Sequence, residues 1–137
     1  MLVIWNGSAG GGADDDTRLK VEESLERHGV TAEIFESPSE AATAERVEAA
    51  LAEGFDAIVA AGGDGTVRSV AFQLLDRDAV LGILPLGTAM NVARSLGIPL
   101  ELDGAAEVLA TGAVTPIDVG EVRGQPFLEI ASIGLGA

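Results

Sequence analysis

Three short segments rich in glycine and hydroxyl residues carry most of the chemistry that this sequence could perform. They span residues 6–12, 62–66 and 85–88. Glycine allows a backbone to approach a ligand closely, and successive N–H groups in such a segment can point at one phosphate. Where a helix follows, its N-terminus adds a partial positive charge. The pattern therefore predicts a phosphate-binding site made largely of backbone atoms.

The middle segment, Gly62-Gly63-Asp64-Gly65-Thr66, is the most informative of the three. Three glycines around one acid, directly after an apolar run, are more than a tight turn requires. Asp64 could cap a helix, but an acid beside phosphate-binding amides is better explained as a group that acts through Mg²⁺. For residues 6–12 a plain turn is the simpler explanation. Neither GxxxxGK[ST] nor GxGxxG occurs in the chain.

Apolar runs and amphipathic segments alternate along the chain and would position these three segments. The predicted strands are residues 2–5, 31–35, 56–61 and 79–84, and the predicted helices are residues 17–28, 37–54, 67–75, 89–96 and 102–110. Such alternation is typical of an α/β fold with a parallel sheet and helices on both faces. Each glycine-rich segment follows a strand, and ligands of open parallel sheets bind at the carboxyl ends of the strands.

The end of the chain has a different pattern. Residues 114–122 and 126–133 are β-like runs on either side of Arg123-Gly124, which signals a hairpin. The hairpin is expected to lead toward a missing β-rich domain. The predicted organisation is an α/β domain over residues 1–125 and the start of a truncated second, β-rich domain over residues 126–137. An open β-like end favours association, so a homodimer is a candidate state.

The composition narrows the class of protein. The 137 residues include no cysteine and a single histidine, His28, which excludes disulfides and multi-histidine metal clusters. Eight basic residues against 22 acidic ones give a net charge of −14, which disfavours nucleic acid and tight docking on anionic membranes. Solubility or a salty cytoplasm explains this charge, and an acidic patch for a basic partner is the alternative. No apolar run reaches the roughly 18 residues of a membrane span, so a cytoplasmic location with only transient membrane contact is predicted.

Several segments resemble one known superfamily. Residues 60–66, Ala-Ala-Gly-Gly-Asp-Gly-Thr, are similar to the GGDGT signature shared by diacylglycerol kinases, sphingosine kinases and NAD kinases. The lipid-kinase branch is indicated by further segments at matching spacing: residues 81–88 (LGILPLGT), 93–99 (ARSLGIP) and 116–120 (PIDVG), with Asn6 and Gly10 fitting the family's first loop. The resemblance covers nearly the whole chain and identifies it as the N-terminal, nucleotide-binding part of a diacylglycerol-kinase-like protein.

The resemblance implies an ATP-dependent kinase that transfers the γ-phosphate to a lipid hydroxyl with the help of Mg²⁺. It implies catalytic and metal-binding roles for Asp64 and Asp118. Thr88 would contact the nucleotide through its hydroxyl. Arg94 would bind the nucleotide or, as an equal alternative, form an ion pair with a nearby acid. The implied nucleotide-binding residues are Asn6, Gly10, Ser37, Gly62, Gly63, Asp64, Gly65, Thr66, Gly87, Thr88 and Arg94.

The chain also departs from the family's pattern. Gly7 and Ala9 replace a proline and a serine, Arg68-Ser69 replaces Asn-Glu, and Asn91 replaces an acid. The family's general base is a glutamate in the second domain, beyond residue 137, so residues 1–137 alone are expected not to phosphorylate lipid. Two alternatives stay open: a kinase of the same superfamily acting on a sphingoid base or another small hydroxyl compound, and a nucleotide-binding module without catalysis.

Overall fold

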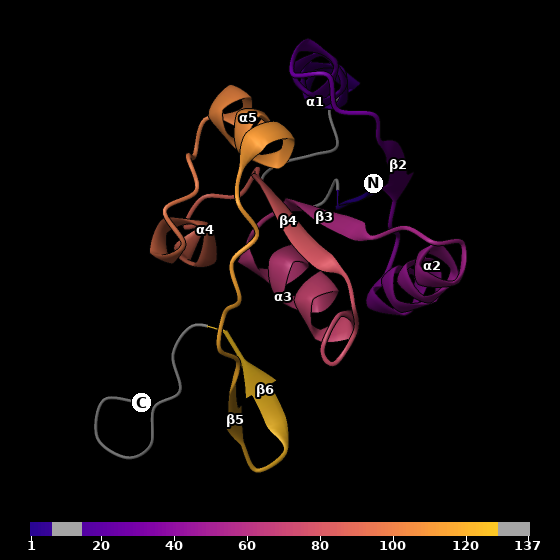
Figure 1. Cartoon of the computed structure of the whole chain (residues 1–137), viewed down its shortest axis with the longest axis vertical. Coiled ribbons are helices and arrows are strands. Elements are labelled where there is room, and N and C mark those ends of the chain that lie inside the picture. Colours follow the sequence, from indigo (N-terminus) through magenta and orange to yellow (C-terminus); the bar gives the residue numbers. More distant parts are fainter. Residues whose placement is uncertain (7–14, 129–137) are drawn as a thin grey trace.

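Four parallel strands form the sheet at the centre of the computed structural model, which describes residues 1–6 and 15–128 (Figure 1). The strands are β1 (Leu2–Trp5), β2 (Glu33–Glu36), β3 (Ala57–Gly62) and β4 (Val80–Pro85). Their order across the sheet is β2-β1-β3-β4, with Leu2 opposite Glu33 on one side and Ile58 on the other. The chain thus winds outward from β1 in one direction and from β3 in the other. The strands are parallel, as the alternating pattern predicts.

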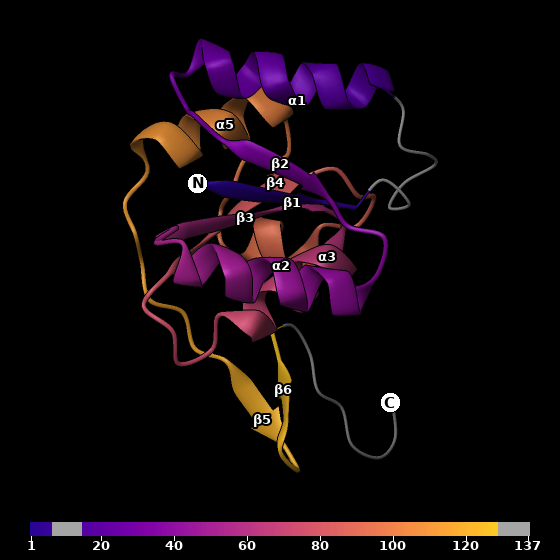
Figure 2. The same cartoon turned by 90° about the vertical axis from the view of Figure 1, so that its right-hand side faces the viewer.

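Helices cover both faces of this sheet, so that the domain has three layers (Figure 2). The helices are α1 (Asp15–Arg27), α2 (Glu40–Ala52), α3 (Asp64–Gln73), α4 (Asn91–Ser95) and α5 (Leu102–Thr111). Helices α1 and α5 pack on the face that carries Val3 and Val59, whereas α2, α3 and α4 pack on the face that carries Leu2 and Ile58. The predicted α/β fold with helices on both faces is confirmed.

Strand β1 is buried on both faces of the sheet. Its four side chains alternate between the two faces, yet all four are at most 4% exposed, because helices lie on each side. Continuous apolar strands of this kind are typical of parallel sheets between two helical layers. The same holds for the buried part of β3, Ile58 to Ala61.

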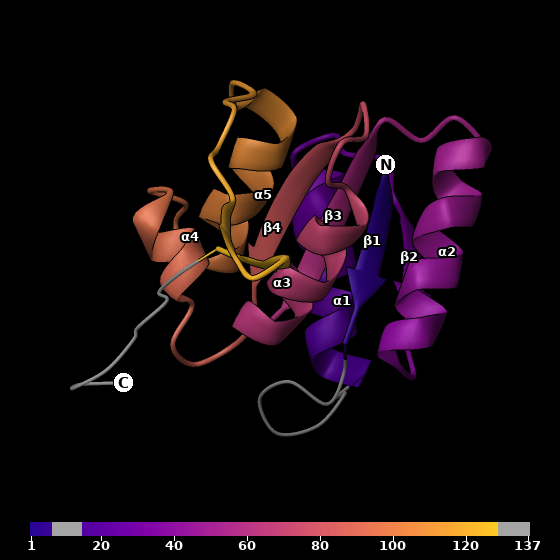
Figure 3. The same cartoon turned by 90° about the horizontal axis from the view of Figure 1, so that it is seen from below.

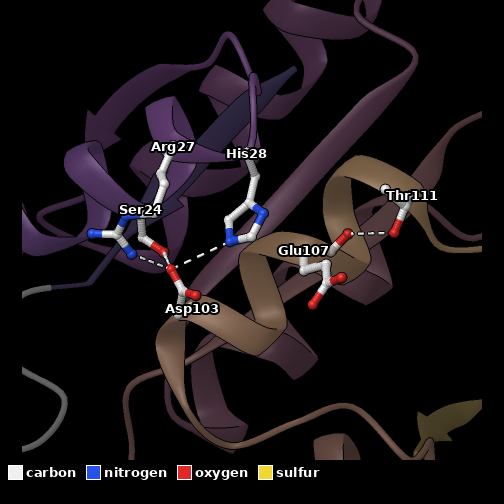
Figure 4. Close-up of polar contacts among 6 residues, drawn as sticks. All are labelled: Ser24, Arg27, His28, Asp103, Glu107 and Thr111. Carbon is white, nitrogen blue, oxygen red and sulfur yellow. Dashed lines mark hydrogen bonds and ion pairs between the residues drawn. The ribbon is translucent and has the colours of Figure 1, made fainter.

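Helices α1 and α5 are also joined by a polar cluster around Asp103 (Figure 4). Asp103 Oδ1 accepts a hydrogen bond from Ser24 Oγ at 3.2 Å and lies 3.3 Å from His28 Nε2, and Arg27 pairs with the same oxygen. Burial by itself raises the pKa of Asp103, but the contacts with His28, Ser24 and Arg27 outweigh it and lower the pKa below its ordinary value. This cluster lies on the face of the sheet that α1 and α5 cover.

Four helices start at different residues from those predicted, and α1 (residue 15 instead of 17) and α2 (residue 40 instead of 37) are two of them. Helix α3 begins at Asp64 rather than Val67, because Gly63 takes the extended N-cap conformation and Gly65 and Thr66 are already helical. Helix α4 spans only Asn91–Ser95, because Met90 before it is left-handed with a φ of 51°. The glycine-rich segment after β3 is therefore mostly the first turn of a helix, not a loop.

A separate antiparallel hairpin follows α5, formed by β5 (Gly120–Val122) and β6 (Gln125–Phe127). Arg123 and Gly124 between them have φ angles of 52° and 76°, as a tight two-residue hairpin turn requires. The predicted hairpin is thus confirmed, but its first strand begins at residue 120 instead of 114. The predicted domain boundary after residue 125 falls within β6, and residues 129–137 lie outside the described part. In Figure 3, which views the molecule from the hairpin's end, the hairpin lies in front of the α/β domain.

Candidate nucleotide site

A pocket of about 360 Å³ opens at the carboxyl ends of β1, β2 and β3. After β1 the chain continues to α1 on one face of the sheet, and after β3 it continues to α3 on the other face. The pocket lies beside this change of face, which is the usual ligand position in such sheets. Of the described residues that line the pocket, Glu40 is the only charged one. The lining residues are Asn6, Ser37, Pro38, Ser39, Glu40, Thr43, Gly63, Gly65, Thr66 and Ser69.

One wall of the pocket is the N-terminus of α3. The first N–H groups of a helix have no partner within it, and Gly63 at the N-cap has no side chain to accept from them. Gly63, Gly65 and Thr66 all border the pocket. Backbone N–H groups and the helix dipole together make this wall suited to an anion.

Thr66 adds a buried hydroxyl to the same wall. The residue is 6% exposed, and its Oγ1 has no hydrogen-bond partner among the described residues. A Cβ on Gly62 would lie 2.4 Å from this oxygen, so the glycine is what allows the threonine side chain to fit. A buried hydroxyl without a partner costs free energy, which a ligand bound at this wall would recover.

The opposite wall is the start of α2 and carries hydroxyl groups. Ser37 follows β2, where its N–H donates to the carbonyl oxygen of Trp5 at 2.8 Å. Its Oγ donates to the carbonyl oxygen of Ser39 at 2.9 Å and lies 2.7 Å from Thr43 Oγ1. Ser39 itself caps α2, since its Oγ accepts from the N–H of Ala42 at 3.1 Å. This wall is therefore fixed before any ligand binds.

Asp64 is engaged with another helix. Its two carboxylate oxygens accept hydrogen bonds from the N–H groups of Asn91 at 3.0 Å and Val92 at 3.1 Å. Met90, which precedes α4, makes no side-chain cap bond of its own. Asp64 is thus a helix cap as the sequence allowed, but the helix that it caps is α4, 27 residues away along the chain.

The segment after β4 packs against the segment after β3. The N–H of Leu86 donates to the carbonyl oxygen of Gly62 at 3.0 Å. A Cβ on Gly87 would lie 2.6 Å from the Cα of Gly63, so only a glycine permits this approach. Thr88, by contrast, is exposed and lies outside the pocket lining.

The remaining predicted residues lie apart from the pocket. Arg94 Nε donates to the carbonyl oxygen of Ala89 at 2.8 Å, and within the described chain Arg94 forms no ion pair. Asp118 is exposed on the segment between α5 and β5, and neither it nor Asp64 lines the pocket. Over residues 1–6 and 15–128, no three acidic or histidine side chains form a group that could hold a metal ion. Gly10 lies outside the described residues.

Comparison with known proteins decides the family. Residues 1–122 match the Diacylglycerol kinase catalytic domain family. The chain belongs to this family. The match extends from β1 through the first strand of the hairpin, so it includes every described residue of the pocket.

Individual relatives agree with this assignment. The chain is 34% identical over 140 aligned positions to a "Probable lipid kinase YegS-like" of Enterobacter sp. (strain 638), covering 98% of this chain and 46% of that protein. It is 45% identical over 75 residues to "Diacylglycerol kinase" of Bacillus subtilis (strain 168), covering 53% of this chain and 25% of that protein. A crystal structure of a diacylglycerol kinase from Bacillus anthracis str. Sterne superposes with a TM-score of 0.79 at 29% identity, covering 93% of this chain and 45% of that one. The chain spans at most about half the length of these relatives.

Five residues that line the pocket are absent from the set predicted from the sequence: Pro38, Ser39, Glu40, Thr43 and Ser69. Of these, Thr43 lies on α2 and Ser69 on α3. Thr43 shares the buried stripe of α2 with Val47 and Ala50, and a hydroxyl on such a stripe is a signal that the sequence does carry.

No helix in the described part of the chain is long and apolar enough to cross a membrane.

Proposed function

We propose that this chain is the nucleotide-binding part of an ATP-dependent lipid kinase that transfers the γ-phosphate of ATP to a lipid hydroxyl. The observation that carries the proposal is the unpartnered, buried hydroxyl of Thr66 beside the N-terminus of α3, in a pocket at the carboxyl ends of parallel strands. Membership of the diacylglycerol kinase catalytic domain family supports the reaction class.

The two walls of the pocket suggest how the nucleotide is oriented. The phosphates would face Gly63, Gly65 and Thr66, where N–H groups and a hydroxyl can donate to them. The nucleoside would face the α2 wall, because the carboxylate of Glu40 there repels phosphate. Asn6 lies between the walls, at the end of β1.

The other predicted residues have supporting parts in this proposal. Gly62 leaves room for the Thr66 side chain, and Gly87 lets the segment after β4 approach Gly63, beneath the phosphates. Thr88, Arg94 and Gly10 would act at the outer edge of the nucleotide, and these roles rest on the family alone.

Magnesium is the metal that fits this chemistry, although only part of its site is formed by the described residues. The carboxylates of Asp64 and Asp118 are hard oxygen ligands of the kind that Mg²⁺ prefers. Each oxygen of Asp64 has an acceptor position left beyond its hydrogen bond to α4. When bound, the ion would neutralise charge on the phosphates. The deprotonation of the lipid hydroxyl stays a prediction for a residue beyond position 137 in a longer protein. Self-association and a cytoplasmic location also stay predictions.

Nucleotide binding tests the proposal directly. Calorimetric titration of the 137-residue chain with ATP and Mg²⁺ is expected to give saturable binding. The Thr66→Val variant should bind several-fold more weakly, because an isosteric methyl group cannot donate to a phosphate. Thr111→Val is the matched control, since the Thr111 hydroxyl bonds only to Glu107 on α5, remote from the pocket.

We expect activity to require a longer protein. We expect the full-length parent to transfer phosphate from ATP to diacylglycerol in mixed micelles, and a parallel assay with a sphingoid base separates the two acceptor classes. Unchanged affinity of Thr66→Val for ATP would refute the proposed position of the phosphates. No binding of ATP by the wild-type chain would refute the proposal as a whole.

A further inference from the structure

The α2 wall of the pocket contains a pair of buried hydroxyl groups, and the family resemblance implies a role for only one of them, that of Ser37. Ser37 is 9% exposed and Thr43 is 5% exposed, and their oxygens lie 2.7 Å apart. Both residues border the pocket. Thr43 lies on the core-facing stripe of α2, where the neighbouring buried positions are Val47 and Ala50. A hydroxyl group there needs a reason, because a valine would fill the same volume without a polar group to satisfy.

The protons of this pair can be assigned from the hydrogen bonds. Each hydroxyl has one proton to donate and two positions at which it can accept. Ser37 Oγ donates its proton to the carbonyl oxygen of Ser39 at 2.9 Å. The 2.7 Å contact must then use the proton of Thr43, which donates to Ser37 Oγ. With its proton and one acceptor position used, Ser37 has a single acceptor position left for a ligand.

We propose that Thr43 is a positioning residue of the nucleotide site, which holds the Ser37 hydroxyl so that it accepts a hydrogen bond from a donor group on the nucleoside. The inference rests on the proposed function, since it takes the ligand to be a nucleotide. It goes further by assigning a chemical preference to the α2 wall. The donor is either the exocyclic amino group of the base or a hydroxyl of the ribose, because these are the groups of ATP that donate outside the phosphates.

The two walls of the pocket then differ in hydrogen-bonding character. Thr66 and the N-terminus of α3 have protons to donate, whereas Ser37 and the Glu40 carboxylate accept. A nucleotide has the matching polarity, with acceptor oxygens on its phosphates and donors on its nucleoside. A nucleotide bound in the reverse direction would place phosphate oxygens against the acceptor position of Ser37 and against the Glu40 carboxylate, both of which disfavour them.

The experiment compares variants and nucleotides in one matrix. Dissociation constants are measured by calorimetry for the wild-type chain, Thr43→Val and Thr43→Ser. The ligands are ATP, inosine triphosphate, which lacks the amino group, and the 2′-deoxy and 3′-deoxy forms of ATP. Thr111→Val is the control variant, because its hydroxyl lies on α5 away from the pocket.

We expect Thr43→Val to weaken ATP binding about 3- to 10-fold, the value of one hydrogen bond, and Thr43→Ser to restore it. The one analogue that lacks the donor facing Ser37 should bind the wild-type chain more weakly by a similar factor. That analogue should also be insensitive to Thr43→Val, whereas the other analogues stay sensitive. A purely structural role for Thr43 would lower the stability of the chain but would weaken all four nucleotides alike.

Three results would overturn the inference. Equal ATP affinity of wild type and Thr43→Val would show that Thr43 does not position the binding hydroxyl. Equal weakening of all four nucleotides would show that Ser37 accepts from no nucleoside donor. If Thr43→Val does not fold, the wild-type chain still decides, since equal binding of ATP and all three analogues would contradict the proposal. Absence of any nucleotide binding by the wild type is a distinct outcome, which refutes the proposed function and this inference with it.

Discussion

Replacement of Asp64 by alanine should destabilise the fold even when no nucleotide is present. The carboxylate accepts hydrogen bonds from the N–H groups of both Asn91 and Val92, and it is the cap of α4. Met90 provides no alternative side-chain cap. Without the carboxylate, the N–H groups of Asn91 and Val92 at the start of α4 lose their partners, and Val92 is buried.

The size of the effect follows from these two bonds. A hydrogen bond to a charged group contributes about 1.5–3 kcal/mol, and loss of a helix cap costs about 0.5–2 kcal/mol. Asn91 is exposed, so water replaces part of its bond, whereas the bond to Val92 is partly buried. We expect Asp64→Ala to lower the free energy of unfolding by about 2–3 kcal/mol. For a chain of this size, the midpoint of thermal unfolding would fall by about 10 °C.

The assay is chemical denaturation in the absence of nucleotide and Mg²⁺. Asp64→Asn should give a smaller loss than Asp64→Ala, because the amide retains one oxygen that can accept. Asp118→Ala is the control, since this exposed carboxylate should change stability by less than about 0.5 kcal/mol. A free energy of unfolding for Asp64→Ala equal to that of the control would refute the capping role. If the loss is found, any effect of this substitution on kinase activity has to be measured at equal folded fraction.

Three further outcomes are expected. Gly87→Ala should lower the free energy of unfolding by about 1–3 kcal/mol in denaturation experiments, because its Cβ would meet Gly63 Cα at 2.6 Å. Gly65→Ala should be neutral or stabilising, because no described atom lies within 4 Å of its Cβ. Equal stabilities of the two variants would contradict the packing of the two segments. The pKa of Asp103 is lowered in the folded chain, so its contribution to stability is complete above the ordinary carboxyl pKa of about 3.9 and is lost as the pH falls through the lower folded value. Unfolding curves of Asp103→Asn should therefore show less loss of stability in acid than wild type, and parallel acid limbs would argue against the cluster. Purified residues 1–137 should not phosphorylate diacylglycerol in a radiometric assay, and robust activity would place the general base within this chain.

The sheet was predictable because its signals are local. The strands β1 and β3 are apolar on both faces, and the chain alternates strand and helix, which limits the topology to a parallel sheet. The start of α3 was predicted wrongly for a physical reason. Glycines disfavour helices by intrinsic propensity, but Gly65 lies in the first turn, where packing of Val67 and Val70 against the sheet overrides that preference.

The site was predictable only for the residues that directly follow a strand in the sequence. Asn6, Ser37 and the segment after β3 each follow a strand, and parallel strands bring their carboxyl ends together. The hydrogen bonds of Asp64 to α4 had no signal in the sequence, because they join residues from two distant segments whose contact exists only after folding. Thr43 was missed for the opposite reason, since its place on an apolar stripe made it resemble a core position.

The order of the strands also affects how the chain can fold during its synthesis. Of the four strands, β1 is synthesised first, yet it lies inside the sheet, because Leu2 pairs with both Glu33 and Ile58. At roughly 5–20 residues per second, β1 waits for about 3–11 s until β3 exists. Collapse and loop closure take microseconds, so translation sets this delay. During this delay, the apolar segment Leu2-Val3-Ile4-Trp5 has no completed sheet to enter, so its side chains stay exposed to chaperones and to association with other chains.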